Sequence, residues 1–467
     1  MITQQDLVQQ LARRGLGAWS VVERVQDLAF AADHPARQRR DHRTRLTLIV
    51  HQDVPRGRGT ARLDIDPFDG YASELVDRAL ALALAAVGPA WTSAPPAAPA
   101  NVTLVDPALV ERELGAVALG TLAGLRRPDR LTLSAAIEVL REKVTVISDA
   151  GLRTTWLATD LRGDALLATP DHSLTLSRHA RRLDDFDLDA AIADAAADLA
   201  LLADAGPPNP GPCSLWLAPE ALLPAPDRFR GDDGLLTLAL GGDAAATAPT
   251  APTATIADAA ADRPAAPAAH HHGLWTLLAQ LADSAVERRG LTRYRLGADI
   301  ARGASQLPEP LSITSNGALD FATLSAPITD DAVAIRSFPL VERGVAVGLG
   351  LSPREAALRA TDPNGGVRNL DVAPGTWIPA PSPTTRTLEL RRLHAVTLDA
   401  YTGDASLDIA LALDHRPGRL STPFTGGTIR LDLLAALARA RRSSQLLRRG
   451  AYHGPAALLI DGAELIA

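Results

Sequence analysis

Apolar and polar positions alternate with two different periods along the first half of the chain. Residues 4–14 and 69–86 repeat apolar positions at helical spacing, as Leu75, Ala79 and Leu82 illustrate. Residues 46–51 and 60–65 alternate instead, with Gly and Pro residues between them. This period is typical of half-buried strands, so these two runs predict antiparallel strands joined by a loop.

Further strands and helices follow in separate blocks rather than in strict alternation. Short strands are predicted between residues 131 and 181, at Leu131–Glu138, Lys143–Ser148, Thr154–Asp160 and His172–Arg178. A helix is predicted at 188–202, with Asp residues at its start, where the helix dipole favours negative charge.

The second half begins after the Gly- and Pro-rich segment 206–211. Residues 311–413 read as strand-rich, and helices are predicted before and after them, at 274–287 and 431–447. A last strand is expected at 456–460. Because helices and strands are segregated, the pattern favours a strand-rich α+β fold with flanking helices over a doubly wound sheet.

The break at 206–211 predicts two domains: an N-terminal α+β domain, 1–205, and a C-terminal strand-rich α+β domain, 206–467. Within the second, residues 241–272 are rich in Ala, Thr, Pro and Asp and end in His270, His271 and His272. Such a composition buries little apolar surface, so we interpret the segment as an insertion. Neighbouring histidines point in different directions, which argues against convergence of the three on one metal ion.

Composition and charge narrow the function classes. The chain of 467 residues is 46% hydrophobic and 22% charged, which is ordinary for globular proteins. The net charge of −7 argues against a nucleic-acid binder, because phosphate binding needs a positive surface. No apolar run is long enough for a membrane helix, and the N-terminus lacks a secretory pattern, so a cytoplasmic protein is expected.

The single cysteine and the densest basic run give only weak signals of chemistry. Cys213 stands beside an apolar strand and is interpreted as a small core residue. The arginines between 37 and 45 suit either a solvated loop edge or contact with an acidic partner. A second basic set, Arg439 to Arg449, is assigned to the end of the helix at 431–447. No nucleophile elbow, Walker A loop or dinucleotide fingerprint is present.

Several segments, in order, resemble the TldD/PmbA (modulator of DNA gyrase) family. They are Asp66–Asp69, Val146–Leu152, Pro207–Leu217, Leu311–Ile313, Arg336–Val345, Asp362–Gly375 and Pro455–Gly462. The segment Tyr401-Thr402-Gly403-Asp404-Ala405-Ser406 resembles the "V-T-G-D-x-S" element of the PmbA, or TldE-like, branch. The chain departs from the pattern at Ala405, where an aromatic residue is usual, and over residues 225–310.

The resemblance implies a role for this chain within a metallopeptidase complex. The catalytic branch of the family carries H-E-x-x-x-H, in which histidines hold a metal and the Glu serves as base. Here none of the eleven histidines is followed by Glu. We therefore expect no catalytic residue, no metal ligand and no cofactor in this chain, and a metal, zinc by expectation, in a TldD-like partner.

The expected function is that of a non-catalytic subunit in a heterodimer or higher heteromer that cleaves peptides or small or unfolded proteins, with peptide natural-product maturation as one use. Candidate substrate-binding residues are Tyr401, Thr402, Gly403, Asp404 and Ser406, although a tight turn explains them equally well. An alternative is a homodimeric binding or scaffold protein without peptidase activity. A third, an enzyme built on residues such as His394, Asp404 and His415, has no spacing rule behind it.

Overall fold

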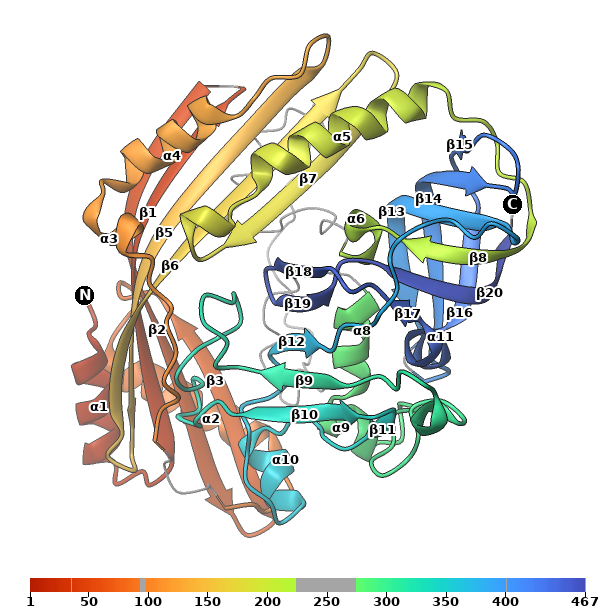
Figure 1. Ribbon diagram of the computed structural model, residues 1–467. Helices are drawn as coiled ribbons and strands as arrows, with labels where there is room; N and C mark the ends of the chain where they lie inside the picture. Colours follow the sequence, from red (N-terminus) through yellow and green to blue (C-terminus); the bar gives the residue numbers. More distant parts are fainter. Residues whose placement is uncertain (35, 93–97, 224–273, 400, 467) are drawn as a thin grey trace.

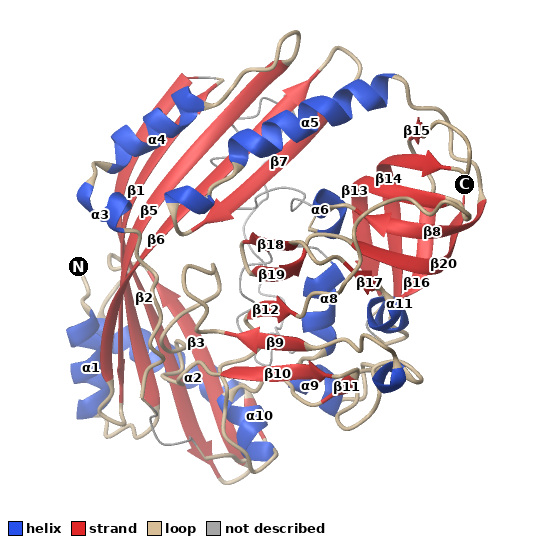
Figure 2. Cartoon of the chain, viewed as in Figure 1, coloured by secondary structure: helices blue, strands red, loops and turns tan. Residues whose placement is uncertain are grey.

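The computed structural model describes residues 1–34, 36–92, 98–223, 274–399 and 401–466. The predicted insertion at 241–272, with its three histidines, lies outside these residues. Strands dominate the described chain and helices pack beside them (Figures 1 and 2), which confirms the α+β prediction. None of the described helices has the length and apolar character that a membrane crossing requires.

The first half builds one antiparallel, seven-stranded sheet in the order β4-β3-β2-β1-β5-β6-β7. Its strands are β1 (Trp19–Asp33), β2 (Ala36–Val54), β3 (Gly57–Ile65), β4 (Val87–Gly88), β5 (Thr132–Ser148), β6 (Arg153–Ala168) and β7 (Ser173–Ala180). Its helices are α1 (Gln4–Arg13), α2 (Ala72–Ala85), α3 (Pro107–Glu111), α4 (Leu114–Gly124) and α5 (Leu188–Ala203), with the 3₁₀ turn η1 (Leu183–Asp185) before α5.

One face of this sheet is apolar, and the other, the charged face, carries ion pairs beside a small apolar cluster with Ile328. Along β1, Val21 packs in the same core as α1 and α2, while Ala29 packs with α4 and α5. Successive side chains of a strand point to opposite faces, so the residues between them point away from the helices. That second face carries Arg24 of β1 and Arg43 of β2, each in an ion pair.

The described residues of the second half form two further sheets. One is six-stranded, in the order β11-β10-β9-β12-β19-β18. Its strands are β9 (Ile313–Asn316), β10 (Ser337–Glu342), β11 (Val345–Ala346), β12 (Asn369–Val372), β18 (Leu446–Arg449) and β19 (Tyr452–Pro455).

The last sheet closes on itself, because β13 pairs with both β8 and β14. The closed ring runs β13-β8-β20-β16-β14, and β15 and β17 pair at its margins. Its strands are β8 (Gly211–Leu217), β13 (Thr387–Leu398), β14 (Asp404–His415), β15 (Thr422–Phe424), β16 (Thr428–Asp432), β17 (Arg441–Arg442) and β20 (Leu458–Ile466).

The second and third sheets share one apolar core. Fully buried Leu215, Leu340 and Leu407, from three different strands, belong to it together with Trp275. The helices of this half are α6 (Pro219–Leu222), α8 (Leu274–Leu281), α9 (Ser284–Arg288), α10 (Pro353–Leu358) and α11 (Leu433–Arg439), with the 3₁₀ turn η2 (Ala304–Gln306). The domain boundary at residue 205 stays a prediction.

The predicted helix at 431–447 is wrong beyond residue 439. The α11 helix ends at Arg439, and residues 441–442 and 446–449 are strands β17 and β18. The side chain of Arg442 is buried and donates to the main-chain oxygens of Ala373, Glu309 and Pro310. These distant acceptors and the strand pairings outweigh the local helix propensity of an Ala- and Arg-rich segment.

Two other expectations also need correction. The Arg-rich stretch 37–45 is not a loop edge, because it forms the first half of β2, where Arg39 and Arg43 both pair with Asp41. The separate strands predicted at 131–138 and 143–148 are one continuous strand, β5. Glu138 and Glu142, which look like breaks in the sequence, point to the charged face of the sheet, where polar residues are expected.

Candidate functional site

The 401–406 segment closes the hairpin between β13 and β14. The carboxylate of Asp399 accepts hydrogen bonds from the amides of Tyr401 and Thr402, at 2.9 and 3.2 Å. These amide bonds, that of Thr402 first, lower the pKa of Asp399. Gly403 has a φ of +78°, a conformation that side chains disfavour, and its amide donates to the Asp399 carbonyl. The segment is therefore held by its own local bonds.

The structure divides the predicted substrate-binding residues into two groups. Tyr401, 65% exposed, and Thr402 line an open hollow of about 470 Å³. Gly403 lies against the side chain of Arg293. Asp404 and Ser406 begin strand β14, and they do not line the hollow. Ala405, between them, is 2% exposed and points into the core. This inward position accepts a small side chain in place of the aromatic residue of the family pattern.

The opposite wall of the hollow comes from the loop segment 290–295, where Gly290, Thr292, Arg293 and Arg295 complete the lining. Arg293 donates from Nη1 to the Thr402 carbonyl and to the Asp432 carboxylate, both at 2.8 Å. Tyr294 points inward, and its hydroxyl donates to the carbonyl oxygen of Leu340. Guanidinium, phenol and hydroxyl groups suit the carbonyl and carboxylate oxygens of a peptide.

Segment 290–295 was missed in the sequence because it belongs to neither a helix nor a strand. Its only signal is the alternation of exposed Leu291, Arg293 and Arg295 with buried Thr292 and Tyr294. Nothing in that alternation indicates that the segment lies opposite residue 401 in the folded chain.

Within the described residues, no group of His, Cys, Asp and Glu side chains is arranged to hold a metal ion. His51 is partly buried, with its ring edge-on to Trp91, and desolvation lowers its pKa to about 4, so it is neutral at pH 7. Cys213 is buried, and the desolvation raises the pKa of its thiol to about 11. Its thiol is thus protonated at neutral pH, in line with the interpretation as a core residue.

The third alternative of the sequence analysis is not assembled as a site. Asp404 and His415 stand at opposite ends of the twelve-residue strand β14. A strand rises by about 3.3 Å per residue, so these side chains are roughly 36 Å apart. His394 and Asp404 therefore cannot work on one substrate bond together with His415.

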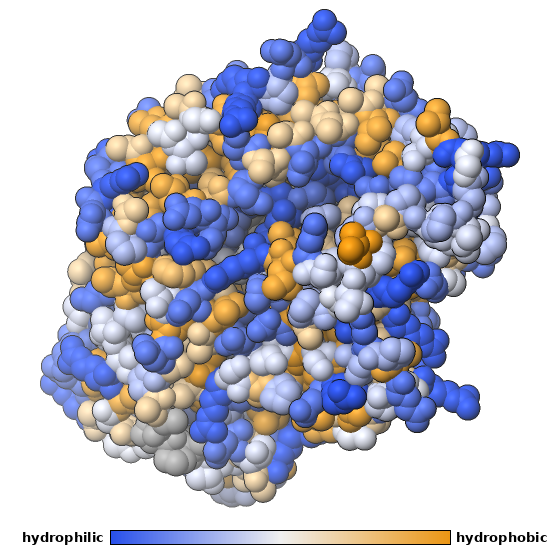
Figure 3. Space-filling view, viewed as in Figure 1, coloured by the Kyte–Doolittle hydropathy of each residue, from blue (hydrophilic) through white to orange (hydrophobic). Residues whose placement is uncertain are grey.

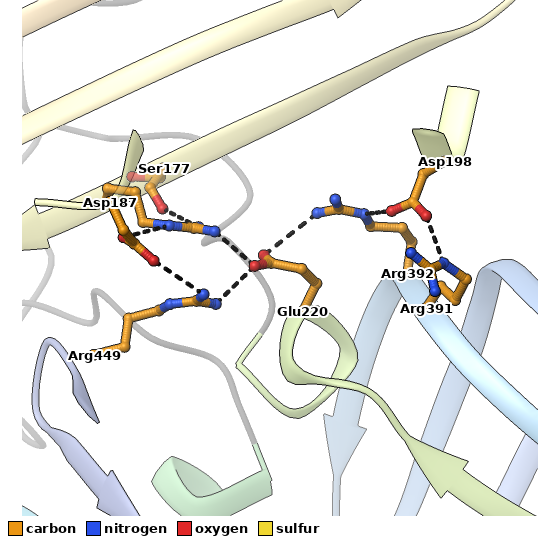
Figure 4. Close-up of polar contacts among 8 residues, drawn as sticks. Ser177, Asp187, Asp198, Glu220, Arg391, Arg392 and Arg449 are labelled. Carbon is orange, nitrogen blue, oxygen red and sulfur yellow. Dashed lines mark hydrogen bonds and ion pairs between the residues drawn. The ribbon is translucent and has the colours of Figure 1, made fainter. Parts of the chain in front are cut away.

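A buried ion cluster joins the first sheet to the second half (Figure 4). We call it the Glu220 cluster, and its members are Arg178, Asp187, Asp198, Glu220, Arg391, Arg392 and Arg449. Figure 4 shows Glu220, on α6, between arginines from three directions. Its carboxylate pairs with Arg178 of β7 at 2.6 Å, Arg449 of β18 at 2.8 Å and Arg392 of β13 at 3.3 Å.

The cluster continues to α5 through a second carboxylate. Asp198 is 1% exposed and accepts from Arg391 at 2.5 Å and from Arg392 at 2.6 Å. Burial by itself would raise the pKa of Glu220, but the charges of Arg178, Arg449 and Arg392 lower it to about 2. Glu220 is thus held as an anion among its arginines, which makes the cluster a structural junction between the two halves.

A second junction lies on the charged face of the first sheet. Asp330, in the loop closed by the Ile328–Ala334 bridge, forms ion pairs with Arg24 of β1 at 2.5 Å and Arg62 of β3 at 3.0 Å. Ser20 donates to the main-chain oxygen of Asp330 at 2.7 Å. On the molecular surface, Figure 3 shows hydrophilic side chains around a hollow at the centre of the view. The two junctions hold the halves together at separate places.

Neither a family model nor a curated protein matches the sequence. Solved structures do match. A putative modulator of DNA gyrase from Bacteroides thetaiotaomicron has a TM-score of 0.71 at 11% identity, covering 99% of this chain and 98% of that one. A putative modulator of DNA gyrase from Thermotoga maritima has a TM-score of 0.67 at 13% identity, covering 99% of each chain.

TldE from Thermococcus kodakarensis is similar over 100% of both chains, with a TM-score of 0.69 and 12% identity. All of these identities are low, but the shared architecture extends from one end of the chain to the other. The protein therefore has the fold of the putative DNA gyrase modulators and of TldE.

Proposed function

We propose that this chain belongs to the TldE-like branch of the TldD/PmbA family and is the non-catalytic subunit of a metallopeptidase complex. The observation that carries the proposal is the fold match to TldE over the whole chain. The order of family-like segments, including the 401–406 segment, supports it independently. In the complex, a TldD-like partner supplies the metal and the base, and the products are shorter peptides or matured small proteins.

The role of this chain is to hold the substrate. The hollow beside Tyr401 offers Arg293, Arg295 and Thr402, which suit the oxygen atoms of a peptide main chain. A peptide held by its main chain is bound with little sequence preference, as in strand addition to a sheet edge. Exposed Leu291, within the segment, and Leu296, directly after it, add apolar contact area.

The test is co-expression with a TldD-like protein that carries H-E-x-x-x-H. The two chains should co-elute and cleave an unstructured peptide, and a chelator should abolish the activity. A matched control replaces the second His of the partner's motif by Ala, which should leave the complex intact and inactive. Replacing Arg293 by Ala in this chain should weaken substrate binding without loss of the complex.

Light scattering separates this proposal from the alternative of a binding or scaffold protein. A heteromer that forms only with the TldD-like chain supports the proposal. A stable homodimer that ignores the TldD-like chain contradicts it and favours the alternative.

A further inference from the structure

A serine, a histidine and a glutamate form a continuous hydrogen-bonded chain on the outer side of the β13–β14 sheet. Ser421 Oγ lies 2.6 Å from Nδ1 of His415, and Nε2 of His415 lies 3.0 Å from Oε2 of Glu389. A flipped imidazole would present carbon atoms to both partners, so the two contacts together fix the orientation of the ring. A nucleophile, a base and a carboxylate that orients the base are the parts of a serine hydrolase relay.

Strand register explains why these residues meet. Thr387 of β13 is opposite His415 of β14, so Glu389 lies two residues along β13 on the same face as His415. Ser421 stands just before β15, whose residues pair back onto the end of β14. The sequence separations are 26 residues for Glu389 and His415 and six for His415 and Ser421. No common motif has this order and spacing.

The surroundings of Glu389 suit its role as the carboxylate that orients His415. Glu389 is 7% exposed, and Arg391 donates to its Oε1 at 2.9 Å. Burial alone would raise the pKa of Glu389, but the His415 hydrogen bond and the Arg391 charge lower it. An ionised Glu389 accepts the Nε2 proton of His415 and leaves Nδ1 free to accept the proton of Ser421.

The surroundings offer an apolar platform beside an accessible hydroxyl. The His415 ring stacks on Trp216 with ring centres 6.1 Å apart, and Trp216 meets Trp377 edge-on at 5.9 Å. Ile378 and Leu420, next to Trp377 and Ser421 in the chain, are 75% and 92% exposed. Exposed apolar side chains of this size suit the acyl or aryl group of a small ligand.

We propose that Ser421, His415 and Glu389 form a second, metal-independent site that hydrolyses apolar carboxylic esters. Ser421 Oγ attacks the ester carbonyl carbon, and its proton passes to Nδ1 of His415. The carbon–oxygen bond to the leaving group breaks, and that oxygen takes the proton and departs as an alcohol. Water then attacks the acyl-serine, its proton returns through His415 to Ser421, and a carboxylic acid is released.

The substrate class is esters rather than peptides. An alcohol leaves more readily than an amine, and the site is open to water, so its general-base assistance of roughly 10²–10⁴-fold suits the easier reaction. Ser421 and His415 touch the reacting atoms and are the catalytic residues. Glu389 acts through His415 and is a positioning residue. The site is independent of the proposed peptidase role, because it uses neither the partner's metal nor the hollow at Tyr401.

The test uses the full chain alone and an alkyl fluorophosphonate, in which serine displaces fluoride from phosphorus. The label should appear on the tryptic peptide 420–430, at Ser421, and a chelator should not change it. Ser421→Ala should abolish the labelling, and His415→Gln should lower its rate at least about tenfold, since the base is lost. The matched control, Ser444→Ala, removes another exposed serine and should change nothing.

Hydrolysis of a nitrophenyl butyrate ester gives the second readout. Glu389→Gln should lower kcat and leave KM unchanged, because the substrate does not touch Glu389. Equal melting temperatures of the variants confirm that each is folded. Absence of label on Ser421 in the wild-type chain, or equal labelling in His415→Gln, would overturn the inference. Neither result affects the peptidase proposal, whose activity is chelator-sensitive and needs the partner.

Discussion

The 401–406 segment and the Glu220 cluster are both built from carboxylates and their donors, but their bonds come from different places. Asp399 is exposed and accepts from amides two and three residues away. Glu220 is 9% exposed and accepts from arginines 42, 172 and 229 residues away. A local exposed turn can change without unfolding the chain, whereas a buried long-range cluster cannot.

This contrast separates the residues that hold the fold from those that can meet a ligand. The cluster ties α5, α6, β7, β13 and β18 to one another, whereas the 401–406 segment is held mainly by bonds within its own turn. Mutations in the cluster should therefore act on stability, and mutations in the 401–406 segment should act on binding.

The largest effect is expected from Glu220→Gln. Loss of this anion leaves Arg178, 4% exposed, and its neighbours without their common partner, which should destabilise the chain by about 3–5 kcal/mol. Urea unfolding measures it. The matched control is Asp362→Asn, because the Asp362–Arg336 pair is exposed and should cost at most about 1 kcal/mol. Equal costs for the two variants would erase the distinction between the regions.

The same cluster predicts a pH dependence. The pKa of Glu220 is lowered from its ordinary 4.5 to about 2, so its stabilisation is complete above pH 4.5. It is lost as pH falls from about 4.5 towards 2. Stability curves of the wild type and Glu220→Gln should converge in that window, and parallel curves would contradict the ion-pair assignment.

Asp164→Asn should stabilise the chain at pH 7.5. Asp164 is 6% exposed on β6, and burial, the largest cause, raises its pKa from 3.8 to about 6. Its stability contribution is present below pH 3.8 and is lost as pH rises through 6. The gain should be about 1–3 kcal/mol at pH 7.5 and should vanish at pH 4, as thermal unfolding at both pH values can measure. A loss of stability at pH 7.5 would show that Asp164 is paired with a cation.

Gly403→Ala should cost about 1–2 kcal/mol, since φ is +78° and the new Cβ meets only the side chain of Arg293 at ordinary contact distance. Chemical denaturation measures the loss. Gly17→Ala is the control, because Gly17 has open space around it and no positive φ. Equal results for the two glycines would remove the need for a left-handed residue in the turn.

Tyr401→Ala should change stability by no more than about 0.5 kcal/mol, because its side chain is 65% exposed. In the complex with a TldD-like chain, KM for peptide should rise by about tenfold with kcat retained, which is the signature of lost binding. Phe68→Ala is the matched control, an aromatic residue 78% exposed on the first sheet's side of the molecule. An unchanged KM would show that the peptide substrate does not bind in the hollow.

The sequence predicted those elements whose pattern is set locally. Helix α5 and strand β3 lie where the period of apolar residues predicted them. The Arg-rich part of β2 was not predicted as a strand. Both of its faces carry charged or polar side chains, so it lacks the alternation of apolar and polar positions that identifies a half-buried strand. The helix predicted past Arg439 failed because the acceptors of Arg442 lie some 70 to 130 residues away.

The candidate sites show the same limit. Tyr401 and Thr402 were found because they sit in a motif, but the opposite wall at 290–295 has no motif. Glu220 and Ser421 were missed because each is an unremarkable residue until the fold brings its partners to it. In both cases the contacting residues come from distant parts of the chain, and no local period of apolar residues indicates that they meet.

The most direct test of the central claim is native mass spectrometry of this chain, alone and after co-expression with a TldD-like protein. We predict that the chain alone carries no stoichiometric zinc, that the complex carries one zinc for each TldD-like chain, and that only the complex cleaves peptide. One zinc for each copy of the isolated chain, or peptide cleavage without the partner, would contradict the account.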